Sequence, residues 1–133
     1  MSVSTEDGLH EHVRIPIPHG VLQGILTIPP EAKGIVIFAH GTGSGRFSPR
    51  NQFVAGVLVE SGLATLLPDL LVESEEGDQE RVFDVELLAD RLLSTASWLS
   101  EDSRTSGLAQ GYFGASTGAA AALIAAARKP DET

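Results

Sequence analysis

The chain of 133 residues is long enough for one domain with a substantial core. Hydrophobic residues make up 42% of it and charged residues 20%, which is typical of globular proteins and excludes an intrinsically disordered chain. Eighteen acidic residues against nine basic ones give a net charge of −9. This charge disfavours nucleic acids and anionic membranes as partners, because both would repel the chain.

Cysteine is absent, which excludes disulfides, thiolate nucleophiles and cysteine-based metal sites. The stretch Met1 to Gly8 has neither a basic start nor an apolar run, so we do not expect a signal peptide. The longest apolar run, residues 119–127, is rich in alanine and is too short and too weakly hydrophobic for a membrane span. We therefore expect a soluble, cytoplasmic protein that uses no cofactor and no metal.

The first part of the chain predicts an antiparallel hairpin. Residues 12–17 and 21–28 alternate loosely between apolar and polar, and Pro18-His19-Gly20 between them is a turn signal. Because Pro16 cannot donate a hydrogen bond to a neighbouring strand, we expect the first strand to lie at an edge of the sheet.

Three further strands are predicted from apolar runs. Residues 34–39 are apolar at every position, as expected of a central parallel strand that is covered on both faces. Residues 63–68 and 108–113, which are mostly apolar, are the other two predicted strands.

Helices are predicted between and after these strands. Ser48 and Pro49 indicate a helix start, and Gly62 indicates its end. A second helix begins after Asp84, and the alanine-rich run forms a third. The apolar residues predicted to share one face are, in the first helix, Phe53, Val54, Val57 and Leu58, and, in the second, Val85, Leu88, Leu92, Ala96 and Leu99.

Alternating strands and helices indicate the α/β class. We predict a mostly parallel sheet with an N-terminal antiparallel hairpin and helices on both faces, within a single domain formed by residues 1–133. In such sheets ligands bind outside the carboxyl ends of the strands. Two glycine-rich segments, residues 40–46 and 114–118, follow predicted strands at such ends.

The second glycine-rich segment reads Gly114-Ala115-Ser116-Thr117-Gly118, a G-x-S-x-G pattern between an apolar strand and an alanine-rich helix. Its glycines let the strand and the helix approach each other closely at a sharp turn. The Ser116 hydroxyl would then lie at a helix N-terminus, where unpaired N–H groups favour developing negative charge. The structural alternative is that Ser116 only caps the helix at a tight turn.

The first glycine-rich segment, His40 to Arg46, predicts a tight backbone loop. Nucleotide or phosphate binding by this loop is disfavoured by its spacing. A P-loop requires Gly-Lys-Ser/Thr at its end, and the dinucleotide fingerprint requires a third glycine where Arg46 stands.

Together, residues 38–45 and 114–118 resemble the motifs of the α/β-hydrolases, in particular the small dienelactone-hydrolase-like enzymes. The resemblance extends from the hairpin to the alanine-rich helix. It implies that Ser116 is a nucleophile that attacks a small-molecule ester or lactone and forms an acyl-enzyme. It also implies that the backbone N–H groups of Thr117 and Thr42 form the oxyanion hole.

The resemblance also assigns loop-shaping roles. His40 would shape its loop and would not act as the general base; the glycines with a similar role are Gly41, Gly43, Gly114 and Gly118. For His10, His12 and His19 no placement near the serine is implied, and we expect them to face solvent. Asp69 follows a strand end and could reach the site, but we expect it to serve capping or loop bonding. The polar residues that either bind an anionic substrate group or lie on the surface are Arg46, Arg50 and Asn51.

One departure from the family is that no histidine follows Ser116. The family takes its triad acid and histidine from later strands. Three interpretations remain open: a truncated part of a longer hydrolase, a half that another chain completes, or a remnant without catalysis. A non-catalytic binding or assembly module with this fold is the alternative function. If the later strands are missing, residues 108–113 form an exposed apolar edge, which predicts self-association.

Overall fold

The computed structural model describes residues 8–18, 20–39, 48–70, 85–114 and 117–128. Within these ranges five strands form one sheet, accompanied by three helices. In chain order the elements are β1 (Leu9–Ile17), β2 (Gly20–Ile28), β3 (Ile35–Ala39), α1 (Pro49–Glu60), β4 (Ala64–Pro68), α3 (Val85–Glu101), β5 (Gln110–Gly114) and α4 (Thr117–Arg128). No helix in these ranges is long and apolar enough to cross a membrane.

The strands are arranged in the order β1-β2-β4-β3-β5. The pairs β1–β2 and β2–β4 are antiparallel, whereas β4–β3 and β3–β5 are parallel. This confirms the predicted α/β class with an antiparallel N-terminal hairpin, and it places β3 between two neighbours as a central strand.

The hairpin is longer than its pattern suggested. Its register runs from Leu9 opposite Ile28 to Ile17 opposite Gly20, so β1 begins three residues earlier than predicted. β1 is one of the two edge strands of the described sheet, as Pro16 led us to expect.

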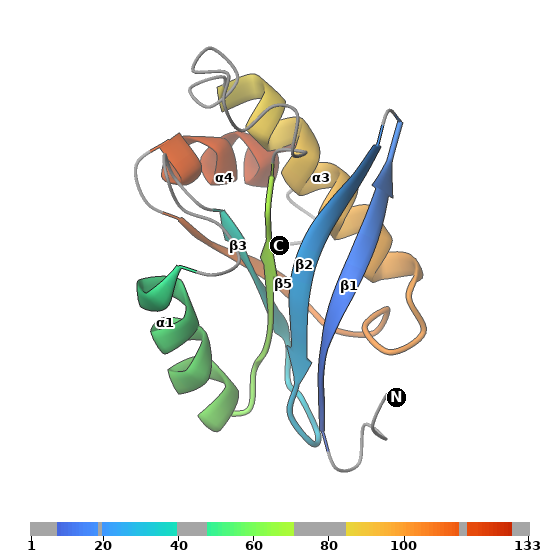
Figure 1. Ribbon diagram of the computed structural model, residues 1–133, viewed down its shortest axis with the longest axis vertical. Coiled ribbons are helices and arrows are strands. Elements are labelled where there is room, and N and C mark those ends of the chain that lie inside the picture. Colours follow the sequence, from blue (N-terminus) through green and yellow to red (C-terminus); the bar gives the residue numbers. More distant parts are fainter. Residues whose placement is uncertain (1–7, 19, 40–47, 71–84, 115–116, 129–133) are drawn as a thin grey trace.

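The two faces of the sheet are covered unequally, with α3 and α4 on one face and α1 on the other (Figure 1). In β3, Ile35, Ile37 and Ala39 belong to the large core under α3 and α4, whereas Phe38 belongs to a small cluster under α1. This alternation follows from the two-residue period of a strand. Because both faces are covered, β3 has to be apolar throughout.

Helix α1 begins where predicted, but it is rotated relative to the predicted face. Ser48 caps it by accepting a hydrogen bond from the Asn51 backbone N–H at 3.4 Å, and Gly62 ends it with φ = +94°. The side chains of Phe53 and Val57 are 73% and 49% exposed. The face in contact with the sheet consists of Ala55, which is buried, and the partly buried Val54 and Leu58.

The second predicted helix agrees with the structure more closely. In α3 the predicted positions Leu88, Leu92, Ala96 and Leu99 are all buried in the large core. Asp84, the expected cap, lies outside the described residues. The last strand, β5, begins at Gln110, two residues later than predicted, since the Leu108 backbone N–H donates to Thr105 in a turn.

The large core should dominate stability. Leu66 of β4 is fully buried in it, so Leu66→Ala should lower the free energy of unfolding by about 2–5 kcal/mol, because the site would lose apolar contacts and keep a cavity. Leu123→Ala on α4 is the matched control: this leucine is 73% exposed, and the expected change is about 0.5 kcal/mol or less. Urea denaturation measures the free energy of unfolding of both variants and of the wild type. Equal losses in the two variants would contradict this description of the core.

Candidate active site at the ends of β3 and β5

The carboxyl ends of β3 and β5 lie next to each other. The two strands pair in parallel from Ile35 opposite Gln110 to Ala39 opposite Gly114. Neighbouring strands are about 4.8 Å apart. Both glycine-rich segments therefore leave the sheet at the same edge, one after Ala39 and the other at Gly114.

The chain passes from β5 to α4 within two residues. Gly114 is the last residue of β5, Thr117 is the first residue of α4, and Gly118 is the second. Because Thr117 opens the helix, its backbone N–H has no acceptor within the helix and lies at the positive end of the helix dipole. A short strand-to-helix junction is what the G-x-S-x-G pattern predicts.

Several predicted site residues lie outside the described residues. These are Ser116, which falls between Gly114 and Thr117, and four residues of the first loop, namely His40, Gly41, Thr42 and Gly43. Their roles therefore stay predictions. What the structure does provide is the position of the residues that flank them.

The described histidines lie far from this junction. His10 and His12 are exposed on β1, at the edge of the sheet opposite β5. Four strand spacings separate the two edge strands, or about 19 Å. Both imidazoles therefore lie far from Gly114 and β5, and their exposure agrees with the expectation that they face solvent. His19 is not among the described residues.

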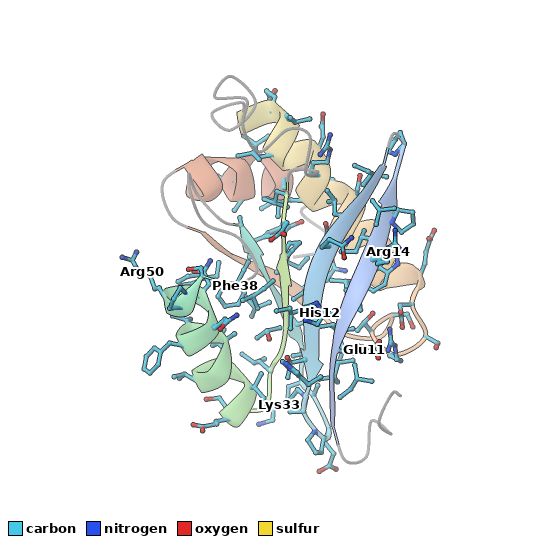
Figure 2. All side chains as sticks on the ribbon, in the orientation of Figure 1. Glu11, His12, Arg14, Lys33, Phe38 and Arg50 are labelled. Atoms are coloured by element: carbon cyan, nitrogen blue, oxygen red, sulfur yellow. The ribbon has the colours of Figure 1, made fainter. Side chains whose placement is uncertain are left out.

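Two other polar candidates, Arg50 and Asp69, are among the described residues. Arg50 is exposed at the start of α1, and its side chain points away from the sheet (Figure 2). The backbone N–H of Asp69, just after β4, donates to the carbonyl of Gln23 at 2.8 Å, in keeping with a residue that fixes a loop. Neither observation brings these side chains to the junction of β5 and α4.

An aromatic pair joins the two strands close to their carboxyl ends. The rings of Phe38 and Phe113 have centroids 5.1 Å apart and planes tilted by 46°. Phe38 points from β3 toward α1 and is buried, whereas Phe113 on β5 is 37% exposed. A tilted pair of this kind stabilises the fold by about 0.5–1.5 kcal/mol in addition to the effect of burying the rings. It therefore helps to hold the ends of the two strands together.

The start of β5 is fixed by backbone and side-chain hydrogen bonds. The Ile35 backbone N–H donates to the Ala109 carbonyl at 2.8 Å. A Cβ atom at Gly34 would lie 3.2 Å from that same carbonyl oxygen, so a glycine permits this close approach. The buried Gln110 donates from Nε2 to the Ala96 carbonyl at 3.0 Å and to Ser100 Oγ at 3.2 Å, which ties β5 to α3.

The loop between α3 and β5 is held by an arginine. Arg104 donates from Nε and Nη2 to the two carboxylate oxygens of Asp102, each at 3.0 Å, and from Nη1 to Glu11 of β1. The hydrogen bond from Arg104 holds the pKa of Asp102 below its ordinary value of 3.8. Sequence reasoning missed Arg104 and Gln110, since hydrophobic periodicity carries no signal for polar positioning residues.

The chain is similar to several proteins of known structure. No family model matches the chain. It is similar to a dienelactone hydrolase from Anabaena variabilis ATCC 29413, with 48% identity and a TM-score of 0.89 over 95% of this chain and 60% of that one. It also resembles Est1E from Butyrivibrio proteoclasticus, with 20% identity and a TM-score of 0.74 over 91% of this chain and 47% of that one. The Pyrococcus furiosus esterase Pf2001 is similar with 20% identity and a TM-score of 0.73, over 92% of this chain and 48% of that one. These two structures, at this identity, support the fold alone.

Two curated relatives come from Mycobacterium tuberculosis, strains CDC 1551 / Oshkosh and ATCC 25618 / H37Rv. Both are named, provisionally, as phosphoribosyl transferases. Each is 54% identical over 112 residues, which is 84% of this chain. The chain spans only about a quarter of the length of these relatives.

The Asp102–Arg104 pair generates a pH prediction. The pKa of Asp102 is lower in the folded state than its ordinary value of 3.8. The ionised carboxylate therefore contributes to the free energy of unfolding at pH values above 3.8, and this contribution is lost as the pH falls through the lower folded pKa. Asp102→Asn should therefore destabilise the chain by about 1 kcal/mol at neutral pH and by progressively less in acid.

Urea denaturation of both proteins across this pH range provides the measurement. Glu101→Gln, a neighbouring exposed substitution on α3, is the control and should show no such convergence with the wild type. A difference between Asp102→Asn and wild type that does not shrink below the ordinary pKa would refute the assignment.

Proposed function

We propose that this chain, which has the fold of the N-terminal part of an α/β-hydrolase and is similar to a dienelactone hydrolase, carries the nucleophile of a serine hydrolase for small carboxylic esters or lactones. The supporting observation is the pairing of Ala39 with Gly114 in adjacent parallel strands. It sets the starts of the two glycine-rich segments side by side. A nucleophile on one segment and an oxyanion donor on the other require such an arrangement.

In the proposed reaction, Ser116 Oγ attacks the carbonyl carbon of the ester and loses its proton to a base. The oxyanion accepts hydrogen bonds from the backbone N–H groups of Thr117 and Thr42, each worth about 3 kcal/mol in the transition state. The C–O bond to the alcohol then breaks, the alcohol takes up the proton, and water later cleaves the acyl-enzyme. The glycines of both segments, with His40, shape the backbone around these groups.

A general base is the component that the described residues do not supply. His10 and His12 lie on the far edge strand, about 19 Å from β5. We propose that the histidine and the triad acid come from residues beyond this chain, so that residues 1–133 form one incomplete domain. In support, the chain covers only 60% of the dienelactone hydrolase chain that it resembles. A cytoplasmic location is part of the same proposal.

Phosphoribosyl transfer is not proposed for this stretch. The mycobacterial relatives carry that name as whole proteins, and this chain spans only about a quarter of their length. The segment from His40 to Arg46 lacks the spacing of the P-loop and of the dinucleotide fingerprint. A binding or assembly module without catalysis is the second candidate, favoured by the distance of the described histidines from β5.

Covalent labelling discriminates between these candidates. A fluorophosphonate probe should modify Ser116 slowly in the purified chain, since the described residues supply no base at the junction, and added imidazole should accelerate the reaction by acting as the missing base. Ser116→Ala should reduce the labelling at least about 100-fold, because the attacking oxygen is gone. Mass spectrometry of peptides identifies the labelled serine.

Ser103→Ala provides the matched control, since Ser103 is an exposed serine in the loop after α3 and its loss should leave labelling unchanged. Labelling spread evenly over exposed serines, or persisting in Ser116→Ala, would rule out the proposed nucleophile. A chain that never reacts at Ser116, even with imidazole, would favour the binding module.

We further propose that β5 mediates self-association, because it pairs with β3 on one side and ends the described sheet on the other. Phe113→Lys should raise the concentration needed for association about 10-fold, since a charged side chain on an edge strand opposes pairing. Leu123→Lys removes a more exposed apolar side chain from α4 and should have little effect. Light scattering over a dilution series measures both, and a wild-type chain that stays monomeric throughout would contradict the proposal.

A further inference from the structure

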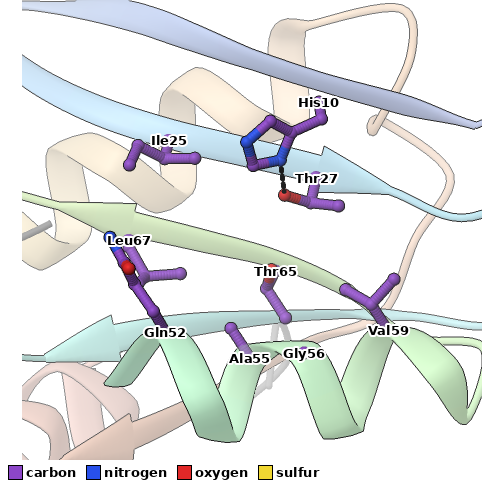
Figure 3. A pocket seen from close by; sticks show the side chains of 9 residues that line it. All are labelled: His10, Ile25, Thr27, Gln52, Ala55, Gly56, Val59, Thr65 and Leu67. Carbon is purple, nitrogen blue, oxygen red and sulfur yellow. Dashed lines mark hydrogen bonds between the residues drawn. The ribbon is translucent and has the colours of Figure 1, made fainter. Parts of the chain in front are cut away.

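A second candidate site lies on the α1 face of the sheet. It is a pocket of about 280 Å³ between α1 and strands β1, β2 and β4 (Figure 3). The lining residues are His10, Ile25, Thr27, Gln52, Ala55, Gly56, Val59, Thr65 and Leu67. None of them comes from β3, β5 or α4, so the lining does not include the elements that meet at Gly114 and Thr117. Helix α1, which follows the first glycine-rich segment, contributes one wall of the pocket.

A row of polar side chains crosses three strands on the wall of this pocket. His10 on β1 is the register partner of Thr27 on β2, and Thr27 is the partner of Thr65 on β4. His10 Nδ1 and Thr27 Oγ1 are 2.8 Å apart and hydrogen-bonded. Thr65 is fully buried, and its Oγ1 has no hydrogen-bond partner among the described residues. A buried hydroxyl without a partner destabilises a fold, and a ligand atom hydrogen-bonded to it would offset that cost.

The opposite wall of the pocket, formed by α1, has a second unusual feature. Gly56 lies in the interior of α1, where glycine is disfavoured relative to alanine. Packing does not require it, since a Cβ atom at this position would have nothing within 4 Å. The missing side chain leaves the space between α1 and the polar row open. Two locally unfavourable choices, Thr65 and Gly56, thus face the same pocket.

We propose that this pocket binds a small, uncharged, mostly apolar molecule that carries one hydroxyl or carbonyl oxygen. The oxygen bonds to the Thr65 hydroxyl, and the apolar body packs against Ile25, Ala55 and Leu67, all of which are buried. The lining contains no lysine, arginine, aspartate or glutamate, so a charged group would be desolvated there without a partner. The volume is near the lower end of the range for small-molecule sites, about 300–1,000 Å³.

Two probes of nearly equal shape test the inference on the full chain. p-Cresol carries a hydroxyl, whereas p-xylene has a methyl group in its place. In an NMR titration of the methyl signals of Ala55, Thr65 and Leu67, p-cresol should bind saturably and about 3–10-fold more tightly than p-xylene, as one hydrogen bond provides. Thr65→Val keeps the shape and removes the hydroxyl. It should lower p-cresol affinity to that of p-xylene.

A second variant blocks the pocket from the helix side. Gly56→Leu should reduce the affinity for both probes more than 10-fold, because its side chain fills the space that glycine leaves open. Val57→Leu, the matched control, adds a methylene to a half-exposed position on the same helix outside the lining and should bind both probes as the wild type does. Ser116→Ala should also bind them normally, which separates this site from the proposed catalytic one.

The inference fails if p-cresol shows no saturable binding to the wild-type chain, or if Gly56→Leu binds it unchanged while its circular dichroism is native. It fails equally if the two probes bind alike and Thr65→Val has no effect. In that case the hydroxyl plays no part in recognition.

Discussion

The parallel pairing of β3 with β5 is the constraint on which the rest of the structure depends. It sets Ala39 beside Gly114, and thereby fixes where both glycine-rich segments leave the sheet. At the other end of the pair, the close approach of Gly34 to Ala109 and the anchoring of Gln110 on α3 hold the register. A shift of one residue would turn the side chains of β5 to the opposite faces, so Phe113 could no longer meet Phe38.

The unequal cover of the sheet explains where binding sites can form. α3 and α4 cover one face, where the described residues form a large apolar core. On the other face α1 makes a smaller cluster around Phe38, Ala55 and Leu67. The sheet is wider than one helix, so β1 and β2 extend beyond α1, and the pocket at Thr65 and Gly56 occupies the space between them.

Fold and chemistry rest on different observations in this protein. The arrangement of strands and its likeness to a dienelactone hydrolase over 95% of the chain identify the fold. The same fold supports many reactions, so the proposed activity depends on particular groups. The proposed nucleophile falls between Gly114 and Thr117, and its base, which the described residues do not supply there, is part of the same proposal.

The sequence by itself determined the elements whose signal is local. The apolar run of β3, the repeat of leucines in α3 and the cap at Ser48 each reflect a period or a hydrogen bond within a few residues, and each was predicted correctly. Only the tertiary structure decided the order of the strands, since pairing joins residues far apart in the chain, such as Ala39 and Gly114.

The tertiary structure also decided which face of α1 is buried. Apolar residues surround most of this helix, so periodicity could not choose among them. Contact between the small Ala55 and the cluster of Phe38 and Leu67 turned Phe53 outward. The tertiary structure likewise made the unpaired hydroxyl of Thr65 a candidate ligand-binding group. A polar residue in an apolar strand can bind a ligand only where a neighbouring helix leaves space beside it.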